Sequence, residues 1–317
     1  VTGVQTCALP IFSFIAGLYF SIKASAMLEL DMRYVDKKHG SASFLDLIGA
    51  TPESISSNGI SIDNKQHQFN LYQEYAKSKI RKYELEKFLS PRSISIFEED
   101  FEYPTQKNEM DRFLASMISS QTKKSIAKIH GYFQDFAYLE AVKVYFEQPK
   151  TFALFQRFAD PLKWNTLFPS SFNTSCAVHI RLGDFRKSLR ASYGILSPSY
   201  YLDCMNYVRD RKSQMNFVIY SDEILLAREI YAELDGENVE WYGYNEKQSK
   251  ITNIDTFWRL ASATDLILGN STFGFWAAAL APNLDSVYYP WPMYRRSNSQ
   301  GILSLPSTWQ TIESKFI

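Results

Sequence analysis

The chain has 317 residues, 45% of them hydrophobic and 21% charged, which is an ordinary balance for a globular protein of about two domains. Its 34 basic and 34 acidic residues cancel and form no basic stripe, which argues against a nucleic-acid partner. No apolar run reaches the roughly 20 residues that span a bilayer, which favours a soluble protein.

The first residues differ in character from the rest. Residues 1–11 read VTGVQTCALPI without an initiator methionine and resemble a translated sequencing-adapter read-through, so we expect them to be non-native. The apolar run at 8–20 lacks the basic start and the small-residue cleavage site of a signal peptide.

Cysteine and histidine are too sparse for a metal centre. Cys7, Cys176 and Cys204 contain no CxxC pair, and the four histidines are scattered without metal-ligand spacing. The sequence therefore predicts no metal site. The low cysteine count favours a reducing compartment.

The first half predicts a mixture of elements. In chain order they are a helix at 12–30, a short strand at 27–31, loops and short pieces at 36–66, a helix at 71–89, and a mostly helical stretch at 108–146 that is broken near Gly131. Prolines and serines near residue 170 indicate a domain boundary there.

The second half alternates between short apolar runs and amphipathic segments. The predicted strands are 176–180, 217–220, 239–242, 265–269 and 286–289, and the helices between them are 199–211, 223–234, 255–263 and 272–280. This rhythm predicts an α/β fold with a doubly wound parallel sheet. Such sheets bind ligands at the carboxyl ends of their strands.

A His-x-Arg-x-Gly-Asp pattern follows the first of these strands. Arg181 stands where the strand ends, and its planar guanidinium can hold two phosphate oxygens. Gly183 permits a tight turn or a positive φ, and Asp184 can hold the arginine or cap the following helix. A strand-end salt bridge beside a hydrogen-bonded His179 would explain the same residues without a ligand, so both interpretations stay open.

Ser221-Asp222-Glu223 follows the second strand. Ser221 or Asp222 is a suitable N-cap for the next helix. Alternatively, the carboxylate of Asp222 could accept hydrogen bonds from N1–H and N2–H of a guanine base.

Residues 268–276, Leu-Gly-Asn-Ser-Thr-Phe-Gly-Phe-Trp, take the chain from a strand into a helix. Free N–H groups at a helix N-terminus bind phosphate. Simple N-capping by Ser271 or Thr272 is the alternative. The Asn-Ser-Thr sequon within this segment carries no meaning in a cytoplasmic protein.

Together, three strand ends of one predicted sheet offer a cation, a carboxylate and a helix N-terminus, a combination that suits a nucleoside diphosphate. The chain has no P-loop and no GxGxxG pattern, which argues against an ATPase or a dehydrogenase. No Asp-x-Asp near these strands could hold Mg²⁺ or Mn²⁺.

These segments resemble those of the α-1,2-fucosyltransferases, glycosyltransferase family 11. Residues 179–185 resemble the family's H-x-R-x-G-D-[YF] motif, and 217–223 resemble its strand ending in Ser-Asp-Asp, with Glu223 departing at the last position. Residues 270–276 and 131–134 resemble its Asn-Ser-[ST]-Phe and Gly-Tyr-Phe-Gln stretches. The first motif is shared with α-1,6- and protein O-fucosyltransferases, but the order and spacing of all four extend the resemblance over residues 12–317.

The resemblance implies a GT-B-type architecture, with two Rossmann-like domains around a cleft. Residues 12–170 would form the acceptor-side domain and residues 171–317 the GDP-fucose-binding domain. The catalytic residues would be Arg181 and Asp184, and the donor-binding residues His179, Arg181, Asp222, Asn270, Ser271, Thr272 and Phe273. No metal and no cofactor besides the donor GDP-fucose are implied.

The implied reaction is inverting transfer of fucose to the 2-hydroxyl of a galactoside, in a glycan such as O-antigen or capsule. The protein would be cytoplasmic, with peripheral contact at the inner membrane face. Two alternatives stay open: a nucleotide- or glycan-binding relative with weak catalysis, and a transferase for another GDP-sugar. Residues 8–10 stand where the family has a Gly-Gly-Leu-Gly-Asn-Gln loop, so we expect that native loop to be missing.

Overall fold

The computed structural model of this chain describes 14 segments. They are residues 15–17, 19–20, 23, 28–30, 60–62, 94–98, 106–119, 126–130, 133–146, 175–187, 190–243, 253–281, 284–296 and 302–317. The expected helix at 71–89, the expected domain boundary near residue 170 and the adapter-like segment 1–11 lie outside them.

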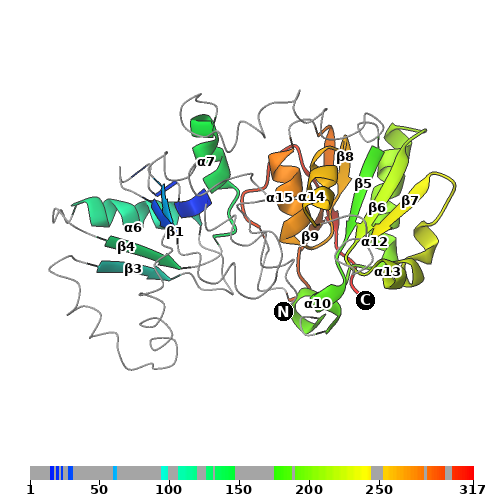
Figure 1. The fold of residues 1–317 in the computed structure, drawn as a ribbon, viewed down its shortest axis with the longest axis horizontal. Helices are drawn as coiled ribbons and strands as arrows, with labels where there is room; N and C mark the ends of the chain where they lie inside the picture. Colours follow the sequence, from blue (N-terminus) through cyan, green and yellow to red (C-terminus); the bar gives the residue numbers. More distant parts are fainter. Residues whose placement is uncertain are drawn as a thin grey trace.

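A six-stranded parallel sheet organises the second half, in the order β10-β9-β8-β5-β6-β7 (Figure 1). Its strands are β5 (Ser175–Ile180), β6 (Asn216–Ser221), β7 (Val239–Gly243), β8 (Asp265–Ile267), β9 (Ser286–Trp291) and β10 (Gln310–Glu313). Within this sheet, the first strand along the chain is the central β5, and β6 and β7 follow outward on one side. The chain then returns to the other side of β5 with β8. The prediction of a doubly wound parallel sheet is therefore confirmed, and the direction of winding reverses between β5 and β8.

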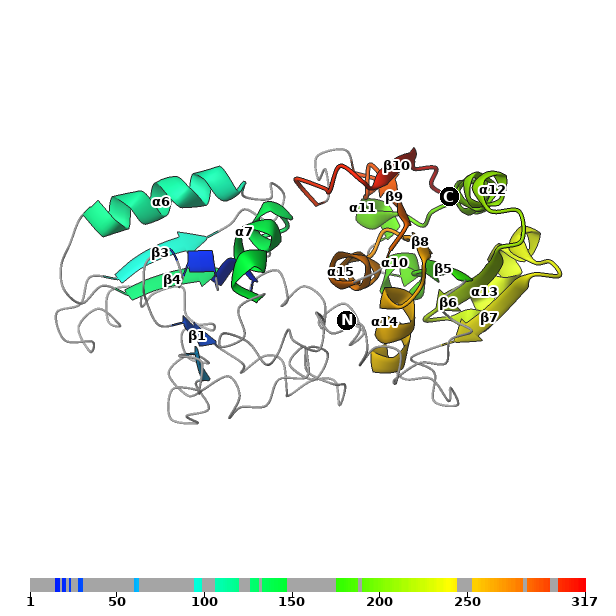
Figure 2. The same ribbon diagram turned by 90° about the horizontal axis from the view of Figure 1, so that it is seen from above.

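Helices cover both faces of this sheet (Figure 2). They are α12 (Pro198–Arg211) and α13 (Ile224–Ile230) on one face, and α14 (Asn253–Ala261) and α15 (Thr272–Leu280) on the other. Three short pieces, α10 (Gly183–Lys187), α11 (Arg190–Tyr193) and the 3₁₀ turn η2 (Ala232–Leu234), complete the connections. The predicted helix at 272–280 has the predicted bounds, whereas the predicted helix at 223–234 is divided into α13 and η2.

Each central strand buries both of its faces, because side chains alternate across a sheet. Cys176, Val178 and Ile180 of β5 join the apolar cluster under α12 and α13. Ala177, between them, joins the cluster under α14 and α15. The short apolar runs in the sequence therefore reflect a sheet covered by helices on two sides.

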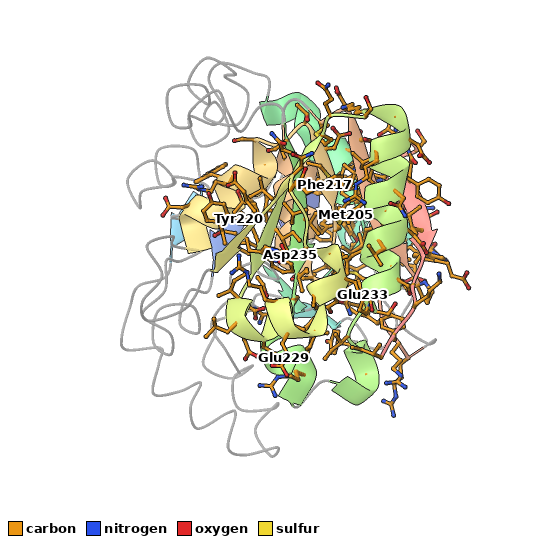
Figure 3. The ribbon with its side chains drawn as sticks, turned by 90° about the vertical axis from the view of Figure 1, so that its right-hand side faces the viewer. Met205, Phe217, Tyr220, Glu229, Glu233 and Asp235 are labelled. Carbon is orange, nitrogen blue, oxygen red and sulfur yellow. The ribbon has the colours of Figure 1, made fainter. Side chains whose placement is uncertain are left out.

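The outer side of the α12–α13 layer carries mostly polar side chains, with Leu225 of α13, 81% exposed, as an apolar exception. Figure 3 labels Met205 and Phe217, which are buried in the apolar cluster under α12 and α13. Glu229 of α13 and Glu233 of η2 are exposed. This contrast is the ordinary pattern of an amphipathic helix on a parallel sheet.

The described residues of the first half form two parallel strand pairs and two complete helices. β1 (Leu28–Leu30) pairs with β2 (Ile60–Ile62), and β3 (Ile94–Glu98) pairs with β4 (Ile126–His130). The helices are α6 (Lys107–Ser119) and α7 (Ala137–Phe146), and residues 15–17, 19–20 and 23 are also helical. The two-domain GT-B arrangement remains an expectation.

Three details of the first-half prediction need correction. The helix expected at 12–30 cannot extend to its end, because residues 28–30 form β1, as the overlapping strand prediction required. The mostly helical interpretation of 108–146, broken near Gly131, is wrong at β4, and β3 was not predicted. Each of these strands is five residues long and gains its backbone partners from the other, so the local sequence pattern gave only a weak signal.

Two segments distant in the sequence join the two halves. The backbone N–H of Phe136 donates to Leu303 O at 3.0 Å, and the N–H of Leu303 donates to Gln134 O at 2.8 Å. The ring of Phe136 lies 6.0 Å from that of Phe275 in α15, which itself lies 5.2 Å from Trp309. Apolar residues of both halves therefore share one core.

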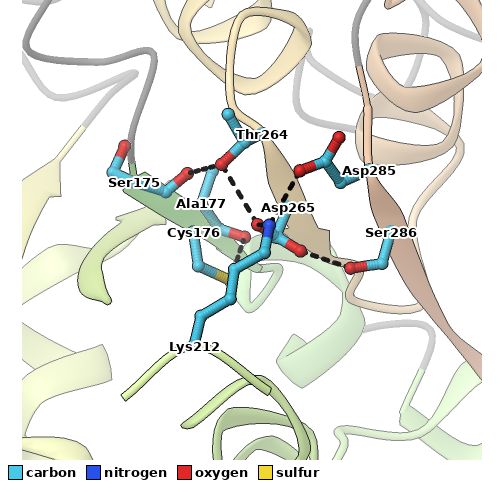
Figure 4. Close-up of polar contacts among 8 residues, drawn as sticks. All are labelled: Ser175, Cys176, Ala177, Lys212, Thr264, Asp265, Asp285 and Ser286. Atoms are coloured by element: carbon cyan, nitrogen blue, oxygen red, sulfur yellow. Dashed lines mark hydrogen bonds and ion pairs between the residues drawn. The ribbon is translucent and has the colours of Figure 1, made fainter. Parts of the chain in front are cut away.

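A network of polar side chains closes the amino edge of the sheet, where β8 and β9 begin (Figure 4). Lys212 Nζ, just beyond α12, donates to Asp265 Oδ2 at 2.6 Å and to Asp285 Oδ2 at 2.9 Å. Ser286 and Thr264 also donate to Asp265, whose side chain is only 2% exposed, whereas that of Asp285 is 63% exposed. The buried carboxylate thus connects α12 to the starts of two strands.

No helix in the described segments has the length and apolar character needed to cross a membrane.

The amino-edge network predicts unequal costs for its two carboxylates. Asp265→Ala leaves the Ser286 hydroxyl without its buried acceptor and removes one of the two acceptors of the Thr264 hydroxyl, so we expect a loss of about 2–4 kcal/mol in the free energy of unfolding. Asp285→Ala removes an exposed partner of Lys212 and should cost less than about 1 kcal/mol. Urea denaturation of both variants measures the difference, and equal losses would contradict this account.

Candidate functional site

The three motif-bearing strand ends meet at the carboxyl edge of the sheet. Ile180 at the end of β5 pairs with Ser221 at the end of β6, and Ile267 at the end of β8 pairs with Val178 of β5. The segments after β5 and β8 therefore lie at the position where the winding reverses. That position is where open α/β sheets bind their ligands.

Arg181 forms a buried ion pair with Asp222. Its Nη1 lies 2.6 Å from Asp222 Oδ2, and the two side chains are 1% and 2% exposed. The other carboxylate oxygen, Oδ1, accepts the backbone N–H of Leu182 at 2.9 Å. The first two motifs are thus joined, and the strand-end salt bridge considered from the sequence is present.

The carboxylate that pairs with Arg181 comes from a neighbouring strand, not from the same motif. The sequence offered Asp184, three residues further along, to hold the arginine or to cap the next helix. Asp184 lies inside α10, which begins at Gly183, so it does not stand before that helix as a cap. Its side chain lies outside the described part of the structure.

The surroundings of Asp222 have opposing effects on the pKa of its carboxyl group. Burial raises the pKa, while the positive charge of Arg181 and the hydrogen bond from the N–H of Leu182 lower it, and the net direction is upward. Because arginine keeps its proton in proteins, the guanidinium stays charged beside this carboxyl group.

Gly183 leaves space for the ion pair. A Cβ atom at this position would lie 2.5 Å from Asp222 Oδ2 and 3.7 Å from the Cζ of Arg181. The positive φ considered from the sequence is not observed here; Gly194 is the glycine with a positive φ in the described residues. Gly183 is needed because the carboxylate occupies the place of a side chain.

A second ion pair connects the same two segments on the surface. Arg186 Nε of α10 lies 3.4 Å from Glu223 Oε2, and the side chains are 41% and 26% exposed. Glu223 is also the N-cap residue of α13, without a side-chain capping hydrogen bond. The expectation that Ser221 or Asp222 caps this helix is therefore wrong, because the carboxylate of Asp222 is turned to Arg181.

His179 is fully buried between β5 and α15. Its ring centroid lies 5.5 Å from that of Phe273, and a Cβ added to Gly274 would lie 2.8 Å from its Nδ1. Burial, with a further effect of the charge on Arg181, lowers the pKa of His179 to about 3. The imidazole is therefore neutral at physiological pH and fills the space under the first turn of α15.

The third motif begins α15. Ser271 is the N-cap residue, and its hydroxyl accepts the backbone N–H of Phe273 at 3.3 Å. This confirms the N-capping interpretation, while Thr272 is the first helical residue. The helix starts directly after β8, so its N-terminal dipole is directed toward the carboxyl edge of the sheet.

Asn270 holds the loop that follows α11. Its Nδ2 donates to the carbonyl oxygens of Tyr193 and Gly194, each at 3.1 Å. Gly194 has a φ of +73°, and a Cβ there would lie 2.6 Å from the Phe316 ring. The amide of Asn270, which the sequence placed among the donor-binding residues, therefore already has two partners within the protein.

Two tyrosines of α12 donate hydrogen bonds to the backbone of the site, a role that the sequence alone did not indicate. Tyr200 donates its hydroxyl hydrogen to Leu268 O at 2.8 Å, and Tyr201 donates to His179 O at 3.4 Å. They thus satisfy carbonyl groups beside both strands at the reversal point. Their adjacency at the start of an amphipathic helix was the available signal, but it does not identify their acceptors.

Aromatic rings extend outward from Arg181. Its Cζ lies 5.9 Å from the ring centroid of Phe185, which lies 5.0 Å from Tyr193, which in turn lies 4.6 Å from Tyr294. Among the described residues, no group of three or more His, Cys, Asp or Glu side chains could hold a metal ion. The charged groups that the structure brings together here are a guanidinium and a carboxylate, beside a helix N-terminus.

The family comparison agrees with this geometry. The sequence model of glycosyl transferase family 11 matches residues 130–298, more than half of the chain. The chain belongs to glycosyl transferase family 11. The matched region includes all three strand ends and the residues of the three motifs.

Two curated relatives share part of this family 11 chain. It is 26% identical over 144 residues to an α-1,2-colitosyltransferase of Escherichia coli, covering 44% of this chain and 48% of that protein. It is 25% identical over 133 residues to the O-antigen biosynthesis glycosyltransferase WbnK of Escherichia coli, covering 41% of this chain and 42% of that protein. The matched region thus spans about half or less of each relative.

The buried state of His179 predicts a specific pH dependence of stability. Unfolding returns the imidazole toward its ordinary pKa of 6.5, so between about pH 6.5 and 3 the unfolded chain binds a proton that the folded chain does not. Stability should therefore fall as the pH decreases through this window, by up to about 1.4 kcal/mol per pH unit from this residue.

His179→Gln removes that contribution, so its unfolding free energy should fall less steeply with decreasing pH than that of the wild type. Urea denaturation at several pH values compares the two slopes. Parallel slopes would show that His179 titrates similarly in the folded and unfolded chains.

Proposed function

We propose that this family 11 protein is an inverting glycosyltransferase that moves fucose from GDP-fucose to the 2-hydroxyl of a galactoside in an O-antigen-like glycan. Family membership supports glycosyl transfer. The names of the two relatives support an α-1,2 linkage and an O-antigen context.

The observation that carries the proposal is the position of Arg181. It lies at the end of β5, where the winding of the sheet reverses, close to the start of α15. A guanidinium beside a helix N-terminus supplies positive charge and N–H donors at one place. This combination suits a nucleoside diphosphate.

In the proposed reaction, the acceptor hydroxyl attacks the anomeric carbon of fucose while the bond to the β-phosphate of GDP breaks. Negative charge grows on the departing diphosphate. Arg181 and the N-terminal end of α15, which begins at Thr272, would stabilise that charge, which they do best when their positions are fixed before the reaction. Attack from the face opposite GDP inverts the configuration at this carbon.

The acceptor hydroxyl must also lose its proton to a base. We assign that role to Asp184 or to a carboxylate of the first half. Among the latter, Asp135 is a poor candidate because its two oxygens accept the backbone N–H groups of Lys107 and Ala137, at 2.9 and 3.0 Å. Asp135 instead ties together the starts of α6 and α7.

A second candidate function is transfer of a different sugar from a GDP donor. The colitosyltransferase relative favours it, because that protein is named for a sugar other than fucose. A third candidate function is a nucleotide- or glycan-binding protein with weak catalysis. It is favoured because Arg181, Asp222 and Asn270 already have partners within the protein. The proposal includes peripheral contact with the inner membrane face, where we expect the protein to meet its glycan acceptor.

Arg181→Lys should lower the transfer rate about 10²–10³-fold, because an ammonium group cannot reproduce the planar fork that meets both a carboxylate and a phosphate. Arg186→Lys is the matched control, since Arg186 forms the exposed ion pair on α10, the helix that follows Arg181, and its rate should stay within about threefold. Rates measured with labelled GDP-fucose and a galactoside acceptor test this. Unchanged transfer by Arg181→Lys would restrict Arg181 to a purely structural role.

Donor profiling separates the proposed functions. We expect GDP-fucose to be consumed faster than other GDP-sugars and UDP-sugars, both with a galactoside acceptor and by slow hydrolysis without one. Preference for another GDP-sugar would select the second candidate function. GDP binding without consumption of any donor would select the binding protein.

A further inference from the structure

We propose that Tyr193 is a specificity-determining residue of the donor site: its half-buried ring packs against the transferred sugar around C6 and favours a 6-deoxyhexose. This inference rests on the proposed function and names the residue that recognises the sugar.

The order of the strands gives the donor a direction along the carboxyl edge of the sheet. Asp222, which the sequence associates with a guanine base, follows β6, on one side of the central β5. Its oxygens accept hydrogen bonds from Arg181 and Leu182, and each carboxylate oxygen can accept a second one, which leaves capacity for a base. The start of α15, which the proposed function gives to the diphosphate, follows β8 on the other side of β5. A donor bound in this way extends its sugar away from β6, toward the segments after β8 and β9.

Tyr193 lies on that side of the sheet. Its carbonyl oxygen accepts hydrogen bonds from Nδ2 of Asn270, directly before the N-cap of α15, and from the backbone N–H of Arg295, after β9, both at 3.1 Å. In Figure 2, α11, which ends at Tyr193, lies nearer to the first half than β6 and β7 do. A sugar beside Tyr193 would thus lie between the start of α15 and the half of the chain that we expect to bind the acceptor.

The ring of Tyr193 belongs to an aromatic cluster whose other members are buried. Its centroid lies 5.0 Å from that of Phe185 and 4.6 Å from that of Tyr294, which it meets edge to face. Phe185 and Tyr294 are 2% and 6% exposed, whereas Tyr193 is half-buried. Tyr193 is therefore the member of this cluster that a ligand can reach. A tyrosine ring suits the C–H groups of a sugar, because it offers a large apolar area and loses little conformational entropy.

The loop that carries this ring is held by several segments. Asn270 also donates to the carbonyl oxygen of Gly194 at 3.1 Å, and the N–H of Ile317 donates to that of Ile195 at 2.9 Å. Gly194 has a φ of +73°, and the ring of Phe316 occupies the place where a side chain would be, 2.6 Å from a Cβ. The position of the loop is thus set before any ligand arrives, which lowers the cost of binding.

The chemical consequence is a preference at C6 of the sugar. A 6-deoxyhexose has a methyl group there, and covering it with an aromatic ring is favourable. A hexose with a hydroxyl at C6 would lose hydrogen bonds to water at the same place, which is unfavourable. Apolar contacts discriminate against an added hydroxyl by about 10²-fold, so this preference is of moderate size.

The test compares two donors that differ only at C6, GDP-fucose and GDP-L-galactose, with the same galactoside acceptor. We expect the wild type to favour GDP-fucose about 10²-fold in kcat/KM, and Tyr193→Ala to lower this ratio about 10-fold. Tyr193→Phe keeps the ring, so its ratio should stay within about twofold of the wild type. An unchanged ratio in Tyr193→Ala would overturn the inference. An equal fall in Tyr193→Phe would assign the preference to the hydroxyl and overturn the role of the ring.

A binding experiment shows which part of the donor the ring meets. GDP carries no sugar, so the affinities of the wild type and Tyr193→Ala for GDP, measured by calorimetry, should agree within about twofold. A much weaker affinity in Tyr193→Ala would place the ring on the nucleotide and overturn the inference.

Tyr207→Ala is the matched control. Tyr207 is also a tyrosine whose ring packs on another, Tyr288, but it lies on α12 and is 51% exposed. Its removal should leave both the donor ratio and the GDP affinity within about twofold of the wild type. A fall in the donor ratio equal to that of Tyr193→Ala would show that the effect is not specific to the loop and would overturn the inference.

Phe316→Ala provides a second route if Tyr193→Ala does not fold. It removes the ring behind Gly194 and loosens the loop, so the donor ratio should fall in the same direction while the GDP affinity stays unchanged. An unchanged donor ratio in Phe316→Ala would contradict the inference. A wild type that consumes neither donor would overturn the proposed function, whereas a wild type that uses both donors equally would overturn the inference alone.

Discussion

The buried ion pair between Arg181 and Asp222 is the interaction on which the carboxyl edge of the sheet depends. It joins the segments after β5 and β6, and it sets the place of Gly183 and of the backbone at Leu182. Removing either partner would leave an uncompensated charge in a dry environment, which proteins tolerate poorly. The charge that the proposed function requires is therefore held in place by the fold.

The reversal of the sheet winding brings a second element to this edge. Because β8 lies beside β5, the helix that follows β8 starts close to the segment that carries Arg181. The neutral, buried His179 packs under the first turn of that helix, against Phe273. Two residues of the first motif thus serve different purposes, one supporting α15 and the other presenting a charge.

Much of the second half could be predicted from its sequence. Short apolar runs separated by amphipathic helices are typical of a parallel sheet covered on both faces, and the predicted strands at 176–180 and 217–220 match β5 and β6 closely. The final strand β10 was not predicted, because its four residues are mostly exposed and gain their order from pairing with β9. In the first half, β3 and β4 were missed for the same reason: their hydrogen-bond partners lie in a distant segment.

The sequence by itself determined that an arginine stands at the end of a central strand and that a helix with a serine cap follows a later strand, because both depend on local order along the chain. Only the tertiary structure decided which carboxylate meets that arginine. Asp184 is three residues away but lies within α10, whereas Asp222 is 41 residues away and is brought into contact by the pairing of β5 with β6. Strand pairing and register arise from long-range packing, and the order of residues along the chain does not reveal them.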